Sequence, residues 1–114
     1  MARHCNLRAI AEQFIAATNA SDVGASVALF SEEAVIDDPS TGHRFDGHAD
    51  IQTYVERYFI GYRTVTTLIS LHRRDDAHAR AIVDFKGDFG HEIGRLDFTV
   101  SPAGQIERID AALM

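Results

Sequence analysis

Apolar residues in the first half of the chain recur at intervals of three and four, the spacing of a buried helical face. A first helix is predicted to end near residues 19–20, with an apolar stripe of Leu7, Ile10, Phe14 and Ala17. A second, short helix is predicted after a cap at Ser21 or Asp22, with Val23, Val27 and Phe30 on one face. A third is predicted to stop at Gly61, with Ile51, Tyr54, Val55, Tyr58 and Phe59 on its buried face.

After Tyr62 the pattern changes to alternation, and β-branched residues accumulate, which is typical of strands. Four strands are predicted, over residues 63–71, 77–87, 90–100 and 105–113. The turns between them are rich in Gly, Asp and Pro and suit antiparallel hairpins. A short apolar strand is also predicted at residues 33–39, before the third helix.

Helices followed by a meander of strands predict an α+β domain, with the helices on one face of a curved antiparallel sheet. A chain of 114 residues with 46% hydrophobic residues supports one core, so residues 1–114 are expected to form a single domain. No repeat or low-complexity segment interrupts this pattern.

Charge and composition narrow the possible partners. The net charge is −6 and the 11 Lys and Arg residues are scattered, which argues against nucleic-acid binding. The N-terminal sequence is amphipathic, so neither a signal peptide nor a membrane span is expected, and the expected compartment is the cytoplasm. Cys5 is the only cysteine, so no disulfide within the chain is expected, and we do not expect a catalytic thiol there.

The strongest candidate for chemistry is Asp38, which stands at the end of the apolar strand directly before Pro39. An apolar pocket around this carboxyl would raise its pKa and favour a general base. Alternatively, Asp38 only ends a strand and accepts hydrogen bonds from backbone N–H groups in a turn. Both interpretations stay open at this point. Asp37 alternates to the opposite face and is expected to meet solvent.

The order of elements and several motifs resemble the SnoaL-like and ketosteroid-isomerase-like branch of the nuclear transport factor 2-like superfamily. The motifs are residues 28–35 (ALFSEEAV), Asp38-Pro39, residues 44–47 (RFDG), residues 87–89 (GDF), residues 96–100 (LDFTV) and residues 104–106 (GQI). The resemblance covers nearly the whole chain. It implies a cone-shaped domain that encloses an apolar pocket, works without a cofactor and forms a homodimer through its sheet. The same scaffold serves many reactions, so the likeness is specific for fold and weak for function.

The resemblance also implies roles for particular residues. Asp38 matches the proton-shuttling base of ketosteroid isomerase, an enzyme in which the surroundings of each carboxyl group set its pKa. Phe14 and Leu96 stand where that enzyme has its two oxyanion donors, so efficient steroid isomerisation is not expected. Asp97 is one residue from Leu96, and a single step along a strand turns a side chain to the other face.

A second branch, similar to limonene-epoxide hydrolase, needs an Asp-Arg-Asp arrangement around a water. Asp84 lies near the corresponding strand position, but Ile82 occupies the place of the arginine. Pairs of Arg80 with Asp84 or of Arg95 with Asp97 can arise instead, and either pair can equally be an exposed cross-strand contact. We do not expect this hydrolase chemistry.

Histidines and tyrosines offer further candidates. The spacing of the histidines does not match a metal site, so no metal is expected. His91 follows a glycine-rich bend and is either a second acid or base or an exposed loop residue. Tyr54, Tyr58 and Tyr62 are expected to pack their rings in the core, and one of them can supply a relocated hydrogen-bond donor.

The sequence therefore predicts an acid–base enzyme of isomerase, cyclase or dehydratase type, acting on an apolar carbonyl-containing or polycyclic molecule. Asp38 and His91 are the catalytic candidates, and the expected substrate-binding residues are Phe14, Phe30, Tyr54, Tyr58, Asp84, Leu96 and Phe98. The alternatives are a module that binds a ligand without turnover, and an assembly domain that uses its sheet as an interface.

Overall fold

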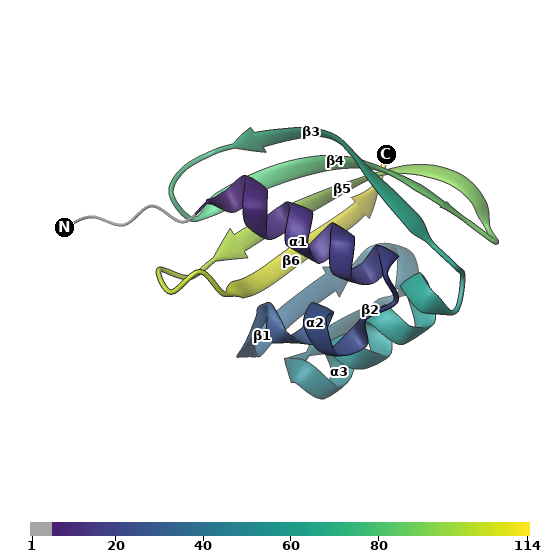
Figure 1. The fold of residues 1–114 in the computed structure, drawn as a ribbon, viewed down its shortest axis with the longest axis horizontal. Helices are drawn as coiled ribbons and strands as arrows, with labels where there is room; N and C mark the ends of the chain where they lie inside the picture. The colour runs from purple at the N-terminus through teal and green to yellow at the C-terminus, as the bar shows by residue number, and fades with distance from the viewer. Residues whose placement is uncertain (1–5) are drawn as a thin grey trace.

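The computed structural model describes residues 6–114, in which three helices lie against one face of a six-stranded sheet (Figure 1). The helices are α1 (Leu7–Asn19), α2 (Val23–Ala28) and α3 (Gly47–Val55). The strands are β1 (Phe30–Asp38), β2 (His43–Asp46), β3 (Val65–Arg73), β4 (His78–Gly87), β5 (Gly90–Val100) and β6 (Ile106–Leu113). The α+β fold class expected from the sequence is confirmed. Cys5 lies outside the described residues.

The sheet runs in the order β2-β1-β6-β5-β4-β3, and its twist and curvature wrap it around the helices (Figure 1). Strands β3 to β6 form the expected antiparallel meander. One pair departs from the expected antiparallel arrangement, because β1 pairs with β6 in parallel. A parallel pair requires a long crossover connection, which β2, α3 and the meander together provide. The sheet is therefore mixed.

Local signals in the sequence explain where the first two helices begin. Asn6 caps α1 by accepting a hydrogen bond from the Ala9 amide at 3.0 Å. Of the two caps considered for α2, Asp22 is the one used, since its carboxylate accepts from the Ala25 amide at 3.0 Å. Each contact satisfies a backbone donor that the first helical turn leaves without a partner.

The third helix differs from the expected regular helix in its last turn. α3 ends at Val55 and passes into a π-helical turn, Glu56–Ile60, closed by a hydrogen bond from the Gly61 amide to the Glu56 carbonyl at 2.8 Å. A Cβ on Gly61 would lie 2.6 Å from the Arg57 carbonyl oxygen, so only glycine fits there. Tyr54 of α3 and Phe59 of the wider turn are both buried in the core, and Tyr58 packs against it.

The centre of the core is an aromatic cluster around Phe14. The ring centroid of Phe14 lies 5.9 Å from each of the rings of Phe30, Phe59 and Phe98, in edge-to-face geometry. Phe14 is 1% exposed, so the interior around this aromatic cluster is filled by side chains.

Strand β2 is an element that the sequence pattern did not predict. It forms a hairpin with β1 through a 3-10 turn, Pro39–Thr41, and Gly42, which has φ +75°. Only four residues long, it has a single buried side chain, Phe45, and so carries little alternation. No helix in the described part of the chain is long and apolar enough to cross a bilayer.

Candidate functional site

A pocket of about 270 Å³ opens between the end of α3 and the hairpin of β4 and β5. Buried residues form its inner end, and exposed residues form its rim. We call this space the pocket; its lining residues are Asp38, Ser40, Thr41, Tyr54, Tyr58, Phe59, Tyr62, Thr64, Phe85, Phe89, Glu92 and Leu113.

Asp38 reaches the inner end of the pocket because of the alternation along β1. Ala34 and Ile36 are fully buried, and Asp38, two residues further, is 8% exposed on the same face. Pro39 then ends the strand and starts the 3-10 turn. Asp37 points to the other face, as expected, where it forms an ion pair with Arg108 at 3.2 Å.

Both carboxylate oxygens of Asp38 accept hydrogen bonds. Oδ1 accepts from the Ser40 hydroxyl at 2.6 Å and from the Ser40 amide at 3.1 Å. Oδ2 accepts from the Tyr54 hydroxyl at 2.8 Å. The carboxylate thus caps a turn, as one of the two interpretations expected, and it also faces the pocket. Oδ1 thus accepts two hydrogen bonds, whereas Oδ2 accepts one and retains a lone pair for a proton or a ligand.

Tyr54 is the fixed partner of Asp38. It is 4% exposed, and burial is the main cause that raises its pKa well above the ordinary value, followed by the negative charge of Asp38 and the hydrogen bond to it. The hydroxyl therefore stays protonated as a donor throughout the neutral range. Its ring packs against Phe45 at 4.9 Å and Tyr58 at 5.4 Å between centroids.

The rim of the pocket is aromatic and partly open to solvent. Tyr62 and Phe89 are each 44% exposed, and their ring centroids lie 6.0 Å apart. A backbone hydrogen bond from the Asp88 amide to the Tyr62 carbonyl, 2.8 Å long, ties the turn after α3 to the β4–β5 hairpin. Glu92 and Leu113 complete the rim. The pocket is therefore bordered at this rim by side chains that solvent reaches.

The residues predicted to contact a substrate fall into three places. Asp38, Tyr54 and Tyr58 come together in the pocket. The remaining apolar candidates lie in the packed core and are not among the residues that line the pocket; they are Phe14, Phe30, Leu96 and Phe98. The third place is the opposite face of the sheet.

Asp84 and His91 lie on the face of the sheet that the helices leave uncovered. His91 Nε2 is 2.5 Å from Asp84 Oδ1, with the histidine side chain 56% exposed. Strand alternation explains this, because His91 has the parity of Asp97, whereas Glu92 has that of buried Leu96. The structure does not bring His91 to Asp38.

The arginines considered from the sequence also lie on this uncovered face, where Arg80 contacts Asp97 rather than Asp84. Arg80 donates two hydrogen bonds to Asp97, at 2.8 and 3.1 Å, and Arg95 approaches Asp97 at 3.5 Å. All three side chains are partly exposed; Arg80 and Asp97 are cross-strand partners, whereas Arg95 and Asp97 stand two residues apart on β5. Within residues 6–114, no group of His, Cys, Asp and Glu is arranged to hold a metal ion.

Sequence reasoning missed several residues that line the pocket. Glu92 and Phe85 are cross-strand partners on the covered face. Their parity could have been counted from Leu96, the same step that separates Leu96 from Asp97. Ser40, Thr64 and Phe89 belong to turns and strand edges, where alternation gives no signal.

Solved structures with the same arrangement carry different names. A proposed ketosteroid isomerase from Kribbella flavida matches with a TM-score of 0.82 and 21% identity over 94% of this chain and 76% of its own. The epoxide hydrolase/cyclase-like enzyme SalBIII, named for a role in pyran ring formation in the polyether salinomycin, gives a TM-score of 0.84 and 19% identity over 94% and 89%.

A computationally designed binder of 17-OHP gives a TM-score of 0.82 and 15% identity over 96% of this chain and 91% of its own. At such identities these likenesses show the fold alone. No curated protein matches the sequence at a significant level. The model of the SnoaL-like domain matches residues 11–112, nearly the whole chain. This protein therefore belongs to the SnoaL-like family, with the NTF2-like fold that its sequence resemblance implied.

Proposed function

We propose that this protein is a small-molecule acid–base enzyme that moves a proton on an apolar carbonyl compound with Asp38 as the general base. The observation that carries the proposal is the 8%-exposed Asp38 carboxylate at the inner end of the pocket, held by Tyr54 and Ser40. A base in such a position is surrounded by little water, and its orientation is fixed before the substrate binds.

In the proposed reaction, a carboxylate oxygen of Asp38 takes a proton from the carbon next to a substrate carbonyl. The electron pair of the broken C–H bond forms a carbon–carbon double bond, the π pair of the carbonyl moves to its oxygen, and the substrate becomes an enolate. The protonated Asp38 then returns the proton to the same or another carbon, which reforms a carbonyl compound. The cycle is balanced and needs no redox partner.

The enolate oxygen needs a hydrogen-bond donor, and Tyr58 is our candidate. Its half-buried ring lines the pocket between Tyr54 and Tyr62, with centroid distances of 5.4 and 5.9 Å. The Tyr54 hydroxyl already donates to Asp38, so it holds the base rather than the substrate. Phe14 and Leu96 supply no donor, which keeps efficient ketosteroid isomerisation outside the proposal.

A ligand-binding module without turnover is the second candidate. It is favoured by the bonds from the Ser40 amide and hydroxyl to Asp38, because a carboxylate that caps a turn has a structural role without any reaction. In that function the aromatic walls of the same pocket would pack against the ligand. The inner end and the rim of the pocket would supply polar contacts.

Proton exchange distinguishes the two candidates. A panel of apolar ketones, such as 2-tetralone and 2-acetonaphthone, is incubated in D₂O, and loss of the proton next to the carbonyl is followed by NMR. We expect wild-type protein to accelerate exchange and Asp38→Asn to lose about a hundredfold or more of the acceleration. Asp37→Asn, one residue away on the other face, is the matched control and keeps the activity. Binding without exchange in wild type would favour the module.

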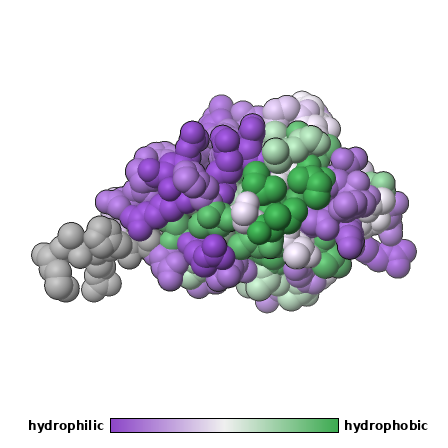
Figure 2. All heavy atoms as spheres, turned by 90° about the horizontal axis from the view of Figure 1, so that it is seen from above, coloured by the Kyte–Doolittle hydropathy of each residue, from purple (hydrophilic) through white to green (hydrophobic). Residues whose placement is uncertain are grey.

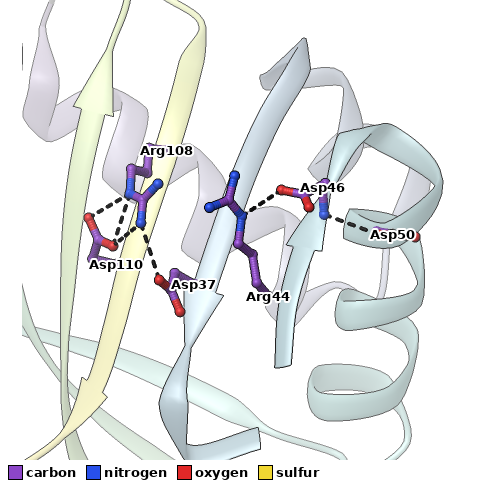
Figure 3. Close-up of polar contacts among 6 residues, drawn as sticks. All are labelled: Asp37, Arg44, Asp46, Asp50, Arg108 and Asp110. Atoms are coloured by element: carbon purple, nitrogen blue, oxygen red, sulfur yellow. Dashed lines mark hydrogen bonds and ion pairs between the residues drawn. The ribbon is translucent and has the colours of Figure 1, made fainter. Parts of the chain in front are cut away.

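We also propose that the uncovered face of the sheet forms a homodimer. Strand β3 exposes Val65 and Ile69 by more than half, and an apolar patch with polar borders is visible in Figure 2. Towards β1 and β2 the charges on this face neutralise one another: Arg108 contacts Asp37 and Asp110, and Arg44 contacts Asp46 (Figure 3). Light scattering tests this, and we expect Ile69→Lys to give a monomer, whereas a wild-type monomer at high concentration would refute it.

A further inference from the structure

The charged side chains that line the pocket are of one sign. Asp38 stands at the inner end and Glu92 at the rim, and no Lys, Arg or His contributes to the lining within residues 6–114. The other lining residues are hydroxyl-bearing or apolar side chains. The pocket is therefore a mostly neutral channel with a carboxylate at each end.

The two carboxylates differ in what satisfies them. Asp38 receives its hydrogen bonds from Ser40 and Tyr54. Glu92 is exposed, and in the described part of the chain it has no ion pair. It sits on β5, directly across from Phe85 of β4. Glu92 is therefore free to bind a cation that arrives with a ligand.

Nearby basic groups do not offset this charge. At the rim, Arg63 is directed to Asp88, with a distance of 3.5 Å between Nε and Oδ2. Lys86 and His91 flank the hairpin, but both contact Asp84 on the other face of the sheet. Since the whole chain carries a net charge of −6, the potential at the pocket entrance favours cations and disfavours anions.

The rim also offers aromatic surfaces next to Glu92. Tyr62 and Phe89 are half exposed, with an angle of 66° between their rings. A protonated amine is attracted to the faces of such rings, and a nearby carboxylate adds to that attraction. A carboxylate or phosphate in the same place would meet Glu92 and the electron-rich ring faces.

We infer that the ligand of this pocket carries a basic nitrogen, protonated at neutral pH, on a compact apolar skeleton. The ammonium group lies at the rim with Glu92, Tyr62 and Phe89, while the apolar body extends inward to Tyr58 and Asp38. The inference rests on the proposed function, because it describes the substrate class of that same pocket. It excludes acids and phosphate esters as ligands.

Three naphthalene probes of the same ring size test the inference on the intact chain. They are 2-acetonaphthone, which is neutral, 2-(aminomethyl)naphthalene, which is cationic at pH 7, and 2-naphthoate, which is anionic. Affinities are measured by following backbone amide NMR signals at several salt concentrations. We expect the amine to bind about three- to tenfold more tightly than the ketone, and naphthoate to bind more weakly than the ketone.

Glu92→Gln should reduce the advantage of the amine over the ketone to within about twofold, and higher salt should reduce that advantage in wild type. Glu107→Gln is the control, because it removes the same charge from β6 outside the pocket. The inference is wrong if the ketone binds but the amine does not bind more tightly than the ketone, or if naphthoate binds as tightly as the amine. In either case the proposed pocket is still a ligand site. If none of the three probes binds, the inference and the proposed function both fail.

Discussion

The interior of this domain has a closed part and an open part, and they are built from similar aromatic residues. Around Phe14, the rings of Phe30, Phe59 and Phe98 meet edge to face and leave no room for a ligand. Around Tyr58, the rings of Tyr54 and Tyr62 border a space of about 270 Å³. Aromatic content alone does not predict a binding site.

Polar atoms make the difference between the two parts. The closed part is filled by phenylalanines, whose burial needs no partner. The open part contains Asp38, Tyr54 and Thr64, each of which needs hydrogen bonds and finds them at the ends of strands and helices. Polar groups with satisfied bonds can line a space that water or a ligand enters, whereas the phenylalanine cluster is stable only when packed.

The largest expected effect is on the closed part. Phe14→Ala should lower the free energy of unfolding by about 3–5 kcal/mol, because it removes the ring at the centre of the cluster. Phe89→Ala, at the rim of the pocket, is the matched control and should cost less than about 1 kcal/mol. Urea unfolding of both variants measures this contrast, and equal losses would contradict the division of the interior.

The next effect concerns the polar partner of Asp38. Tyr54→Phe should lower the free energy of unfolding by about 1–3 kcal/mol, since it removes a buried hydrogen bond to a charged group. Tyr62→Phe removes a hydroxyl from a side chain that is 44% exposed and should change stability by less than about 0.5 kcal/mol. A Tyr54→Phe variant as stable as wild type would show that the hydroxyl does not hold Asp38.

The same tyrosine predicts a pH dependence at alkaline pH. The pKa of Tyr54 is raised in the folded state, mainly by burial, so the unfolded chain releases this proton first. Stability from this residue is complete below the unfolded pKa of about 10 and falls as pH rises further, by at most about 1.4 kcal/mol per pH unit. Unfolding measured from pH 9 to pH 11 should show a smaller decline in Tyr54→Phe than in wild type. Parallel curves for the two proteins would refute this prediction.

The smallest stability effect is paired with a change in binding. Phe89→Leu should leave the unfolding free energy within about 0.5 kcal/mol of wild type, because the side chain lies at the surface. It should nevertheless weaken binding of 2-acetonaphthone by about three- to tenfold, through loss of an aromatic wall. Unchanged affinity would show that the rim does not contact the ligand.

The fold was largely predictable because its elements repeat strong periodic signals. The apolar stripe from Leu7 to Ala17 predicted α1. The alternation of apolar and polar residues predicted β3 to β6 to within about two residues of their observed ends. Strand β2 was missed, and the π-helical turn after Val55 was not anticipated, because a sequence that continues helical spacing does not reveal where one residue is inserted.

The site was less predictable, for a geometric reason. Asp38 could be placed on the inner face from Ala34 and Ile36, and Tyr54 and Tyr58 from their helical spacing. Which part of an apolar interior remains open depends on how side chains fill it, and that is a property of the packed structure. Phe14 and Tyr58 therefore look alike in the sequence and lie in different parts of the interior.

The central claim is that ligands bind in the open part of the interior, beside Asp38 and Tyr58. The most direct test is the pattern of nuclear Overhauser effects between bound 2-acetonaphthone and assigned aromatic protons of the protein. The account predicts contacts to Tyr58, Phe85 and Phe89 and none to Phe14 or Phe98. Contacts to Phe14 and Phe98, or only to residues on the uncovered face of the sheet, would contradict it.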